Sequence, residues 1–496
     1  MGLALVHGRA RAGIRAPEVK VEVHLAGGLP SMSIVGLPEA AVREAKDRVR
    51  AAIQCAQFEF PARRITVNLA PADLPKGGGR FDLPIALGIL AASGQIPAEA
   101  LRDWEFIGEL GLTGELRATD GVLPAALAVA ATGRRLLVPA ANGEEAALAS
   151  EVEVRTARTL LEVCGMLGGQ KSLPVAAAPA QRVSAGPDMR DVRGQAQARR
   201  ALEIAAAGGH HLLLVGPPGC GKTLLASRLP GLLPPLDEQE ALEVAAIHSV
   251  ASHSPLQHWP QRPFRQPHHS ASGPALVGGG SRPQPGEITL AHQGVLFLDE
   301  LPEFDRKVLE VLREPLESGH IVIARARDKV RFPARFQLVA AMNPCPCGYL
   351  GDPNGRCRCT PEQIQRYRNK LSGPLLDRID LHLTVAREAT ALNAAPQTAQ
   401  SSAVLAAQVA EARRLQLARQ GCANAFLDLV GLREHCQLTA EDQAWLERAC
   451  ERLALSLRAA HRLLKVARTL ADLEQAERIG RQHLAEALQY RPGSQA

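Results

Sequence analysis

One stretch of the chain has the residue types and the spacing of a phosphate-binding loop. The apolar residues 212–215 precede the pattern Gly-x-x-x-x-Gly-Lys-Thr, and residues that favour a helix follow it. Glycines let backbone N–H groups converge on phosphate oxygens at the start of a helix. We therefore expect nucleotide phosphates to bind to a continuous loop made of Gly216, Pro217, Pro218, Gly219, Cys220, Gly221, Lys222 and Thr223.

Carboxylates elsewhere in the chain complete this chemistry. We expect the Lys222 ammonium to reach the β- and γ-phosphates and the Thr223 hydroxyl to ligate Mg²⁺. The apolar run 294–298 ends in Asp299 and Glu300. Asp299 is expected to hold Mg²⁺, and Glu300 to polarise the attacking water as a general base. The sequence thus predicts a hydrolase with ATP and Mg²⁺ as cofactors.

Three further side chains are candidates for the same reaction. Asn343 follows an apolar strand expected at 337–342, where an amide would orient the water beside the γ-phosphate. Arg378 stands in Leu-Leu-Asp-Arg, which we place after the last strand of the core. It is a candidate finger for the nucleotide of a neighbouring subunit in a ring. Arg458 is the arginine that we expect to reach the nucleotide from a C-terminal lid.

The cysteines suggest a metal site. Two Cys-x-Cys pairs flank a polar loop and consist of Cys345, Cys347, Cys357 and Cys359. Such pairs supply four thiolates for tetrahedral coordination, and we expect a structural Zn²⁺. The spacing is tighter than the usual Cys-x-x-Cys, so free thiols or a redox pair are alternatives. The other cysteines are scattered, as in a reducing compartment.

A basic segment at 320–332 is a candidate contact for phosphates. Its basic residues alternate, so on an extended strand they project from one face: Arg325, Arg327, Lys329 and Arg331. A turn near Asp328 would make a hairpin that contacts phosphates. The alternative is an edge strand protected by its charge. Aromatic residues make up only 3% of the chain, so base stacking is not expected.

The elements that position these groups form three predicted units. Residues 1–173 mix short strands and helices, and residues 188–385 form an α/β core in which buried strands precede the functional loops. Residues 402–496 have apolar positions at helical spacing and form a helical lid. The Pro/Ala-rich segment 174–187 and the segment 386–401 are expected to be linkers.

Within the core, residues 258–287 are rich in Pro, Gly, His and Arg. We expect a long loop without regular elements, a kind of loop that is usually functional. The adjacent His268 and His269 are either a solvated or packed pair or part of a site, and two imidazoles alone do not make a metal site. Residues 307–318 are expected to form one helix.

Net charge and hydropathy indicate which classes of partner the chain can have. The net charge is +6, and the excess lies beyond residue 173, which is compatible with a polyanionic partner. No apolar run approaches the roughly 20 residues of a membrane span. The first residues carry no signal-peptide pattern, because Arg9 and Arg11 follow directly. We expect a cytoplasmic protein that does not enter a membrane.

The first unit resembles the proteolytic domain of the Lon family. The resemblance rests on Pro75-Lys76-Gly77-Gly78-Gly79 and on a Leu-Thr-Gly-Glu hairpin followed by Gly121. That family uses a Ser–Lys dyad, but the expected positions fall near Arg80 or Phe81 and near Ala125. A hydroxyl nucleophile needs a base within reach. We therefore expect a non-proteolytic domain.

The core motifs resemble the magnesium-chelatase-like AAA+ proteins. The resemblance is carried by Gly-Pro-Pro-Gly-Cys-Gly-Lys-Thr, Arg-Pro-Phe-Arg-Gln-Pro-His-His and Pro-Gly-Glu-Ile-Thr-Leu-Ala-His-Gln-Gly-Val-Leu-Phe-Leu-Asp-Glu-Leu. With the Lon-like domain and the cysteine pairs, the chain is similar to the ComM/YifB group over nearly its whole length. The resemblance implies an α/β P-loop AAA+ core, with the long loop and the basic hairpin as insertions that face the pore of a ring.

The resemblance also implies a function. It implies a homohexameric ATP-driven motor, a helicase or branch-migration translocase, that acts on single-stranded, double-stranded or branched DNA in homologous recombination during natural transformation. Residue spacing alone indicates a nucleotide hydrolase with basic projections. Two alternatives are a chelatase-type AAA+ motor subunit, which would need a partner subunit, and an ATP-dependent protease-like remodeller, which the missing dyad disfavours.

Overall fold

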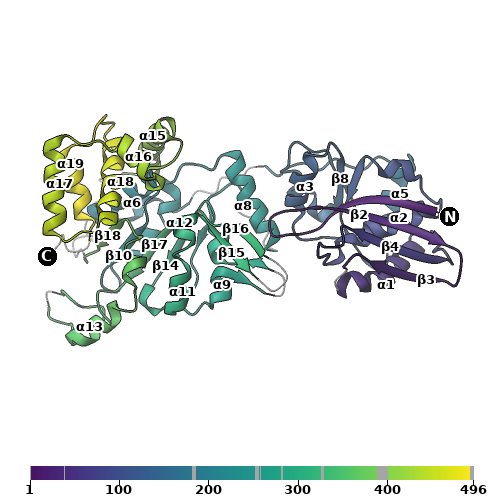
Figure 1. The fold of residues 1–496 in the computed structure, drawn as a ribbon, viewed down its shortest axis with the longest axis horizontal. Helices are drawn as coiled ribbons and strands as arrows, with labels where there is room; N and C mark the ends of the chain where they lie inside the picture. Colours follow the sequence, from purple (N-terminus) through teal and green to yellow (C-terminus); the bar gives the residue numbers. More distant parts are fainter. Residues whose placement is uncertain are drawn as a thin grey trace.

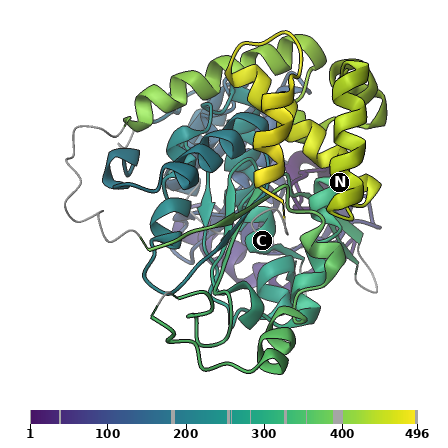
Figure 2. The ribbon, with the colours of Figure 1, turned by 90° about the vertical axis from the view of Figure 1, so that its left-hand side faces the viewer.

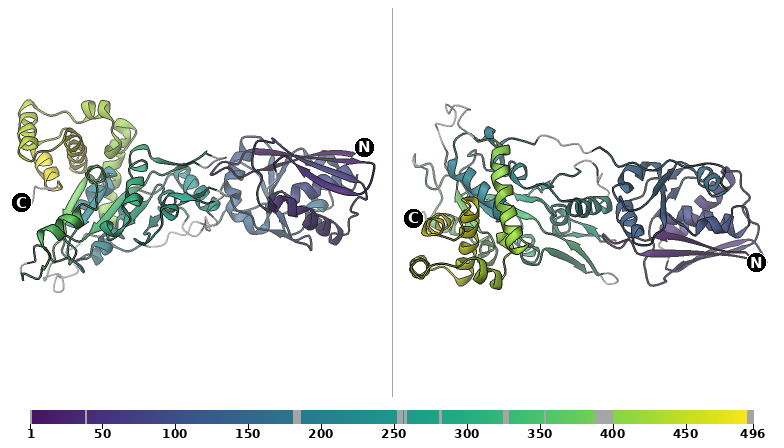
Figure 3. Two further views of the ribbon diagram at one scale, coloured as in Figure 1. Left: turned by 60° about the horizontal axis from the view of Figure 1, so that its bottom comes forward. Right: turned by 90° about the horizontal axis from the view of Figure 1, so that it is seen from above.

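The fold is elongated, with three parts arranged along its longest axis. A computed structural model describes residues 2–37, 40–180, 186–251, 256, 259–280, 283–324, 329–352, 354–387 and 400–491. The N-terminal unit lies at one end, the α/β core in the middle and the C-terminal helices at the other end (Figure 1). Views from other directions show a narrow junction between the N-terminal unit and the core (Figure 3).

The N-terminal unit is built on a seven-stranded mixed sheet. The strand order is β3 (Ser31–Val35), β4 (Arg64–Ala70), β2 (Glu18–Ala26), β1 (Gly2–Arg9), β5 (Trp104–Phe106), β8 (Arg135–Pro139) and β9 (Val154–Ala157). Alternate residues of β2 are buried, as a strand with one covered face requires. The edge beyond β9 pairs with the chain at Val175, which lies in the predicted linker.

Helices cover this sheet. The principal ones are α1 (Ala40–Cys55), α2 (Asp82–Ala92), α3 (Val122–Ala130), the short α4 (Gly143–Ala146) and α5 (Leu160–Leu167). α2 packs on β1 and β2, and α1 packs on α2. α2 is apolar around its whole circumference and almost every residue in it is buried, as expected of a helix between other elements. A short hairpin, β6 (Glu109–Leu110) and β7 (Leu116–Arg117), lies where the Leu-Thr-Gly-Glu motif predicted it.

The core contains a five-stranded parallel sheet. Its order is β11 (Phe264–Arg265), β14 (Val295–Leu298), β17 (Gln337–Met342), β10 (Leu212–Val215) and β18 (Leu381–Thr384). All neighbouring strands pair in parallel. β17 lies between β10 and β14, so the residues that follow these three strands meet at one edge of the sheet. This mixed α/β architecture with a parallel core confirms the predicted fold class.

The C-terminal residues are helical, as their periodicity predicted. They form α15 (Ser402–Gln420), α16 (Leu429–His435), α17 (Ala440–Arg452), α18 (Leu457–Leu473) and α19 (Arg481–Gln489). α15 and α18 both pack on the core helix α6 (Ala196–Gly208). The helices cluster over one side of the core when viewed from the end of the molecule (Figure 2). Apolar residues of α15 and α18 share one hydrophobic cluster with β10, so the lid and the core are packed together.

Helix α8 (Glu238–Val250) connects the core to the N-terminal unit by packing on α3. The Gly121 N–H donates to the Ser249 carbonyl oxygen at 3.0 Å, and the Ser249 hydroxyl donates to Glu145. Ala245 and Ala246 of α8 belong to the same apolar cluster as residues of α3. The junction is therefore a packed interface.

Three expectations about the core are wrong in detail. Residues 258–287 contain short regular elements, namely β11, α9 (Gly273–Val277), β12 (Gly278–Gly279), β13 (Gln284–Pro285) and the start of α10 (Glu287–Leu290). The helix expected at 307–318 is two, α11 (Arg306–Val311) and α12 (Pro315–Ser318), because proline begins a new helix more readily than it continues one. Arg378 does not follow the last strand of the core, because β18 comes after it and pairs with β10.

The basic segment forms a hairpin that is separate from the core sheet. β15 (His320–Ala324) pairs antiparallel with β16 (Lys329–Pro333). In the described part of the chain it is thus a two-stranded sheet of its own. Figure 1 places it beside the N-terminal unit. No helix among the described residues is long and apolar enough to cross a membrane.

Candidate nucleotide site and metal centre

The residues predicted to handle nucleotide meet at the carboxyl edge of the parallel sheet. The loop 216–221 follows β10, Asp299 follows β14 and Asn343 follows β17. α7 (Lys222–Ala226) begins directly after the loop, so its N-terminal N–H groups face the position of the phosphates. Gly219 and Gly221 have φ values of +73° and +89°, which favour glycine at both turns of the loop.

Lys222 and Asn343 are in direct contact. The Lys222 ammonium donates to the Asn343 side-chain oxygen at 3.2 Å and to the carbonyl oxygens of Gly216 and Pro217 at 2.7 and 3.0 Å. The Gly216 N–H donates to the Met342 carbonyl oxygen at 3.1 Å. The phosphate loop is therefore connected to the end of β17, and Asn343 lies beside the lysine that was predicted to bind phosphate.

The oxygens of Thr223 and Asp299 form a pair that suits Mg²⁺. The Thr223 hydroxyl donates to a carboxylate oxygen of Asp299 at 2.8 Å. Mg²⁺ prefers oxygen ligands and keeps several waters, so one hydroxyl and one carboxylate beside a phosphate loop fit its chemistry. Thr223 lies in α7, after the loop that follows β10, and Asp299 follows β14, so the pairing of both strands with β17 brings the two residues together.

Glu300 is held in an unusual conformation next to this pair. Its φ is +52°, which is uncommon for a residue with a side chain, and its N–H donates to Asp299 at 2.9 Å. Its carboxylate lies 3.1 Å from the His269 imidazole. The sequence did not predict this contact, although His269 was noted as one of an adjacent pair. The contact with His269 therefore helps to fix the position of the Glu300 carboxylate, the group predicted to act as general base.

The candidate finger Arg378 contacts the chain away from the phosphate loop. Its guanidinium lies 2.7 Å from Glu317 and donates to the Pro374 carbonyl oxygen at 2.6 Å. The side chain is 7% exposed, and its Nε atom has no hydrogen-bond partner. Burial without a complete set of partners is costly for a guanidinium. These contacts pair the buried Arg378 with Glu317, whose side chain is 42% exposed, rather than with the phosphate loop of its own chain.

Arg458 of the lid contacts the same carboxylate. Its guanidinium forms an ion pair with Glu317, and more than half of the side chain is exposed. One turn further along α18, Arg462 donates to the Arg378 carbonyl oxygen at 2.7 Å and to the buried Asp380 at 2.6 Å. The lid helix thus fixes the backbone of Arg378 and presents Arg458 beside it.

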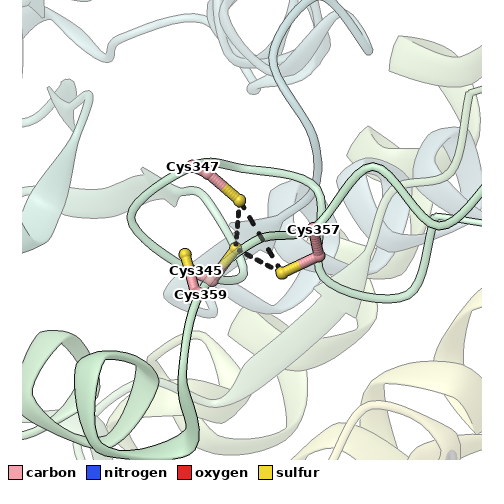
Figure 4. A group of neighbouring side chains, drawn as sticks. All are labelled: Cys345, Cys347, Cys357 and Cys359. Carbon is pink, nitrogen blue, oxygen red and sulfur yellow. Dashed lines mark hydrogen bonds between the residues drawn. The ribbon is translucent and has the colours of Figure 1, made fainter.

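The four paired cysteines form one cluster (Figure 4). Their sulfur atoms all lie within 4.8 Å of one another, and Cys345, Cys347 and Cys357 are 3.4 to 3.8 Å apart. Thiolates at about 2.3 Å from a tetrahedral zinc would be about 3.8 Å apart. Backbone N–H groups of Arg358 and Tyr349 lower the pKa of Cys347 to about 6, whereas the pKa values of Cys357 and Cys359 are raised, so the fit to a metal rests on the separation of the sulfur atoms. The cluster therefore fits a zinc ion.

The hairpin β15–β16 has two distinct faces. Ile321, Ile323 and Phe332 are buried, whereas Arg331 is exposed. Arg325 and Arg327 lie outside the described residues, and only the position of Lys329 in β16 is described. A Cβ at Gly13 of the N-terminal unit would lie 2.5 Å from a Val330 methyl group. One face of the hairpin is therefore covered, and Arg331 is on the other.

The positions expected for a protease dyad are filled by buried residues of the wrong type. Phe81 and Ala125 are 1% and 0% exposed, and Arg80 is 5% exposed. Lys76, the nearest lysine in the loop, is buried and donates to the Pro71 carbonyl oxygen. This geometry offers no hydroxyl at the expected position.

Three family models describe nearly the whole chain. The model described as magnesium chelatase, subunit ChlI, matches residues 188–392. The model described as subunit ChlI of Mg-chelatase matches residues 21–142, within the N-terminal unit. The model described as magnesium chelatase, subunit ChlI C-terminal, matches residues 399–491, which contain the lid helices.

Full-length relatives agree with these matches. Competence protein ComM of Haemophilus influenzae is 53% identical over 500 residues, which cover 99% of this chain and 98% of that protein. The Escherichia coli protein YifB is 53% identical over 99% of this chain and 97% of its own length. The magnesium-chelatase 38 kDa subunit of Cereibacter sphaeroides is 27% identical over 30% of this chain and 51% of that subunit. The chain therefore belongs to the ComM/YifB family of magnesium-chelatase-like AAA+ ATPases.

Proposed function

We propose that this chain is an ATP-driven DNA motor that assembles as a homohexamer and promotes branch migration when transforming DNA is integrated by homologous recombination. The observation that carries the proposal is the full-length similarity, at 53% identity, to a relative named competence protein ComM. That name associates the relative with competence. A competence ATPase whose substrate is DNA needs a hydrolytic site and a surface for a polyanion.

The geometry of the nucleotide site supports the ATPase half of the proposal. Lys222 would bind the phosphates, Thr223 and Asp299 would hold Mg²⁺, and Glu300 would activate water beside Asn343. All five residues lie at one edge of the sheet, connected by the contacts of Lys222 with Asn343 and of Thr223 with Asp299. Bound ATP and Mg²⁺ would supply the phosphoryl group and its charge neutralisation.

The location of Arg378 supports assembly into a ring. A finger is needed to stabilise the charge that develops on the γ-phosphate. Arg378 and Arg458 are paired with Glu317 instead of lying at the loop of their own chain. A closed ring would place this surface against the nucleotide of the next subunit. We therefore assign Arg378 as a finger that acts between subunits.

The basic hairpin and the net charge support DNA as the substrate. Each subunit of a ring would present Arg325, Arg327, Lys329 and Arg331 on one projecting hairpin. Repeated phosphate contacts of this kind bind DNA with little regard for sequence. The cysteine cluster is proposed to hold one structural Zn²⁺, which agrees with the separation of its sulfur atoms.

The proposal is tested by the ATPase rate of the purified protein with branched DNA, with a porphyrin and with casein. We expect stimulation by DNA only. Stimulation by the porphyrin would favour a chelatase motor, and stimulation by casein a protease-like remodeller; either result without a DNA effect contradicts the proposal. The chelatase alternative has weaker support, because the similarity to the 38 kDa chelatase subunit covers less than a third of this chain.

A further inference from the structure

The cysteine loop lies directly on the phosphate loop. Gly348, which follows Cys347, has a φ of +80° and is buried. A Cβ at Gly348 would lie 2.6 Å from Cδ and 2.8 Å from Cγ of Pro218. Real Cβ atoms do not approach carbon so closely, so the two loops are in contact with no space for a methyl group.

A second connection reaches the same proline from the outer part of the cysteine loop. The Arg387 guanidinium donates to the Pro218 carbonyl oxygen and lies 6.0 Å from the centre of the Tyr349 ring. Arg356 lies 4.6 Å from that ring and is paired with Asp352 through two hydrogen bonds of 2.6 and 2.9 Å. Both guanidinium groups thus make cation–π contacts with the ring of Tyr349, which connects the cysteine loop to Arg387.

A third connection comes from the inner end of the loop. Asn343, which accepts from Lys222, is separated from Cys345 by a single residue. A shift of the backbone at Cys345 would therefore also move the Asn343 side chain, which contacts Lys222. The cysteine loop touches Pro218 and the adjoining Asn343 contacts Lys222, so the two contacts lie on either side of Gly219 and Gly221.

We infer that the metal-bound cysteine loop positions the phosphate loop, so that zinc at Cys345, Cys347, Cys357 and Cys359 sets the affinity of the chain for ATP. The inference rests on the proposed zinc site. Four thiolates on one ion close the loop and remove much of its conformational freedom. Without the ion, the backbone at Gly348 is not held against Pro218, and ATP must order both loops when it binds. Ordering one additional residue weakens binding by about tenfold.

Two glycines of the same loop provide a matched test that requires no removal of metal. Gly348 and Gly351 have φ values of +80° and +81°, so an alanine imposes the same backbone strain at each. A Cβ at Gly351 meets nothing within 4 Å, whereas one at Gly348 meets Pro218. The readouts are the Kd for a fluorescent ATP analogue in Mg²⁺ and the zinc content of each full-length variant.

We expect Gly348→Ala to raise the Kd by about tenfold or more, with zinc content and circular dichroism as in the wild type. Gly351→Ala should leave the Kd within about twofold, because it adds the strain without the contact. Equal effects of the two substitutions, or no effect of Gly348→Ala, would overturn the inference.

A second experiment separates this inference from the zinc proposal. Zinc is stripped with a chelator under reducing conditions, the chelator is removed, and the Kd is measured in Mg²⁺ before and after zinc is returned. We expect the Kd to rise on stripping and to recover with zinc. An unchanged Kd in a stripped protein that remains folded overturns the coupling and leaves the zinc site intact. A purified, reduced protein without zinc overturns the zinc site itself.

Discussion

The guanidinium of Arg378 lies 2.7 Å from a carboxylate oxygen of Glu317, and Arg458 pairs with the same oxygen. One arginine belongs to the α/β core and the other to the helical lid. A single carboxylate therefore gathers both arginines that the sequence predicted to act on nucleotide. Both arginines therefore lie beside one partly exposed carboxylate, and we propose that they serve the nucleotide of the subunit that faces it.

This relationship predicts complementation between subunits. Arg378→Ala and Lys222→Ala should each abolish ATP hydrolysis, since one removes the finger and the other removes phosphate binding. Mixed rings of the two variants should recover part of the activity, because some interfaces combine an intact loop with an intact arginine. Arg458→Ala should behave like Arg378→Ala in this assay. Absence of rescue in confirmed mixed rings would argue against action between subunits.

Removal of either of two arginines one turn apart in α18 should destabilise the protein by very different amounts. Asp380 is 3% exposed and is paired with Arg462, so Arg462→Ala leaves a buried charge without that partner. We expect a loss of about 3–5 kcal/mol in the free energy of unfolding. Arg458 is largely exposed, and Arg458→Ala should cost about 1 kcal/mol or less. Denaturant unfolding of both variants measures the two losses in the free energy of unfolding. Equal losses would contradict a stabilising role of the buried ion pair between Arg462 and Asp380.

The cysteine cluster predicts one zinc ion per chain. Metal analysis of protein purified with reduced thiols should detect zinc near one equivalent. The double substitution of Cys357 and Cys359 by serine should remove it, because two thiolates hold zinc far more weakly than four. Serine in place of Cys164, which is buried in the N-terminal unit, is the control and should leave the zinc content unchanged. A zinc-free wild-type protein contradicts the assignment.

The basic hairpin predicts a salt-dependent loss of DNA binding. Alanine at both Arg325 and Arg327 should weaken binding to all sequences alike and reduce the slope of log K against log salt by about 0.9 for each lost phosphate contact with duplex DNA. The basal ATPase should survive, because Ile321, Ile323 and Phe332 carry the packing of the hairpin. If the affinity for DNA and its salt dependence are unchanged, the hairpin does not contact DNA, and its charges only protect the edges of its strands.

Much of the nucleotide site was predictable because each of its residues lies close in sequence to the strand that positions it. Gly216, Asp299 and Asn343 each begin a polar or glycine-rich turn directly after a buried strand. All three strands form where the sequence predicted them. Parallel pairing then places the three turns at one edge. The cysteine cluster was predictable for the same reason, since each pair has its two thiols almost adjacent in sequence.

Contacts between distant segments were not predictable. Nothing near His269 indicates that its partner is Glu300, and nothing near Glu317 indicates that it pairs with arginines of the core and the lid. The strand 381–384 was missed because His382 and Thr384 interrupt the continuous apolar run that marks the equally short strands 212–215 and 295–298. Such features depend on the packing of the whole core, and propensity and periodicity report only on neighbours in the chain.

The most direct test of the central claim follows a labelled four-way DNA junction with the purified protein, Mg²⁺ and ATP. The account predicts that the wild type moves the branch point with ATP, that Glu300→Gln binds ATP and the junction without moving it, and that Lys222→Ala fails to bind ATP. A wild-type protein that hydrolyses ATP and binds the junction, yet leaves the branch point where it was, would contradict the assignment as a branch-migration motor.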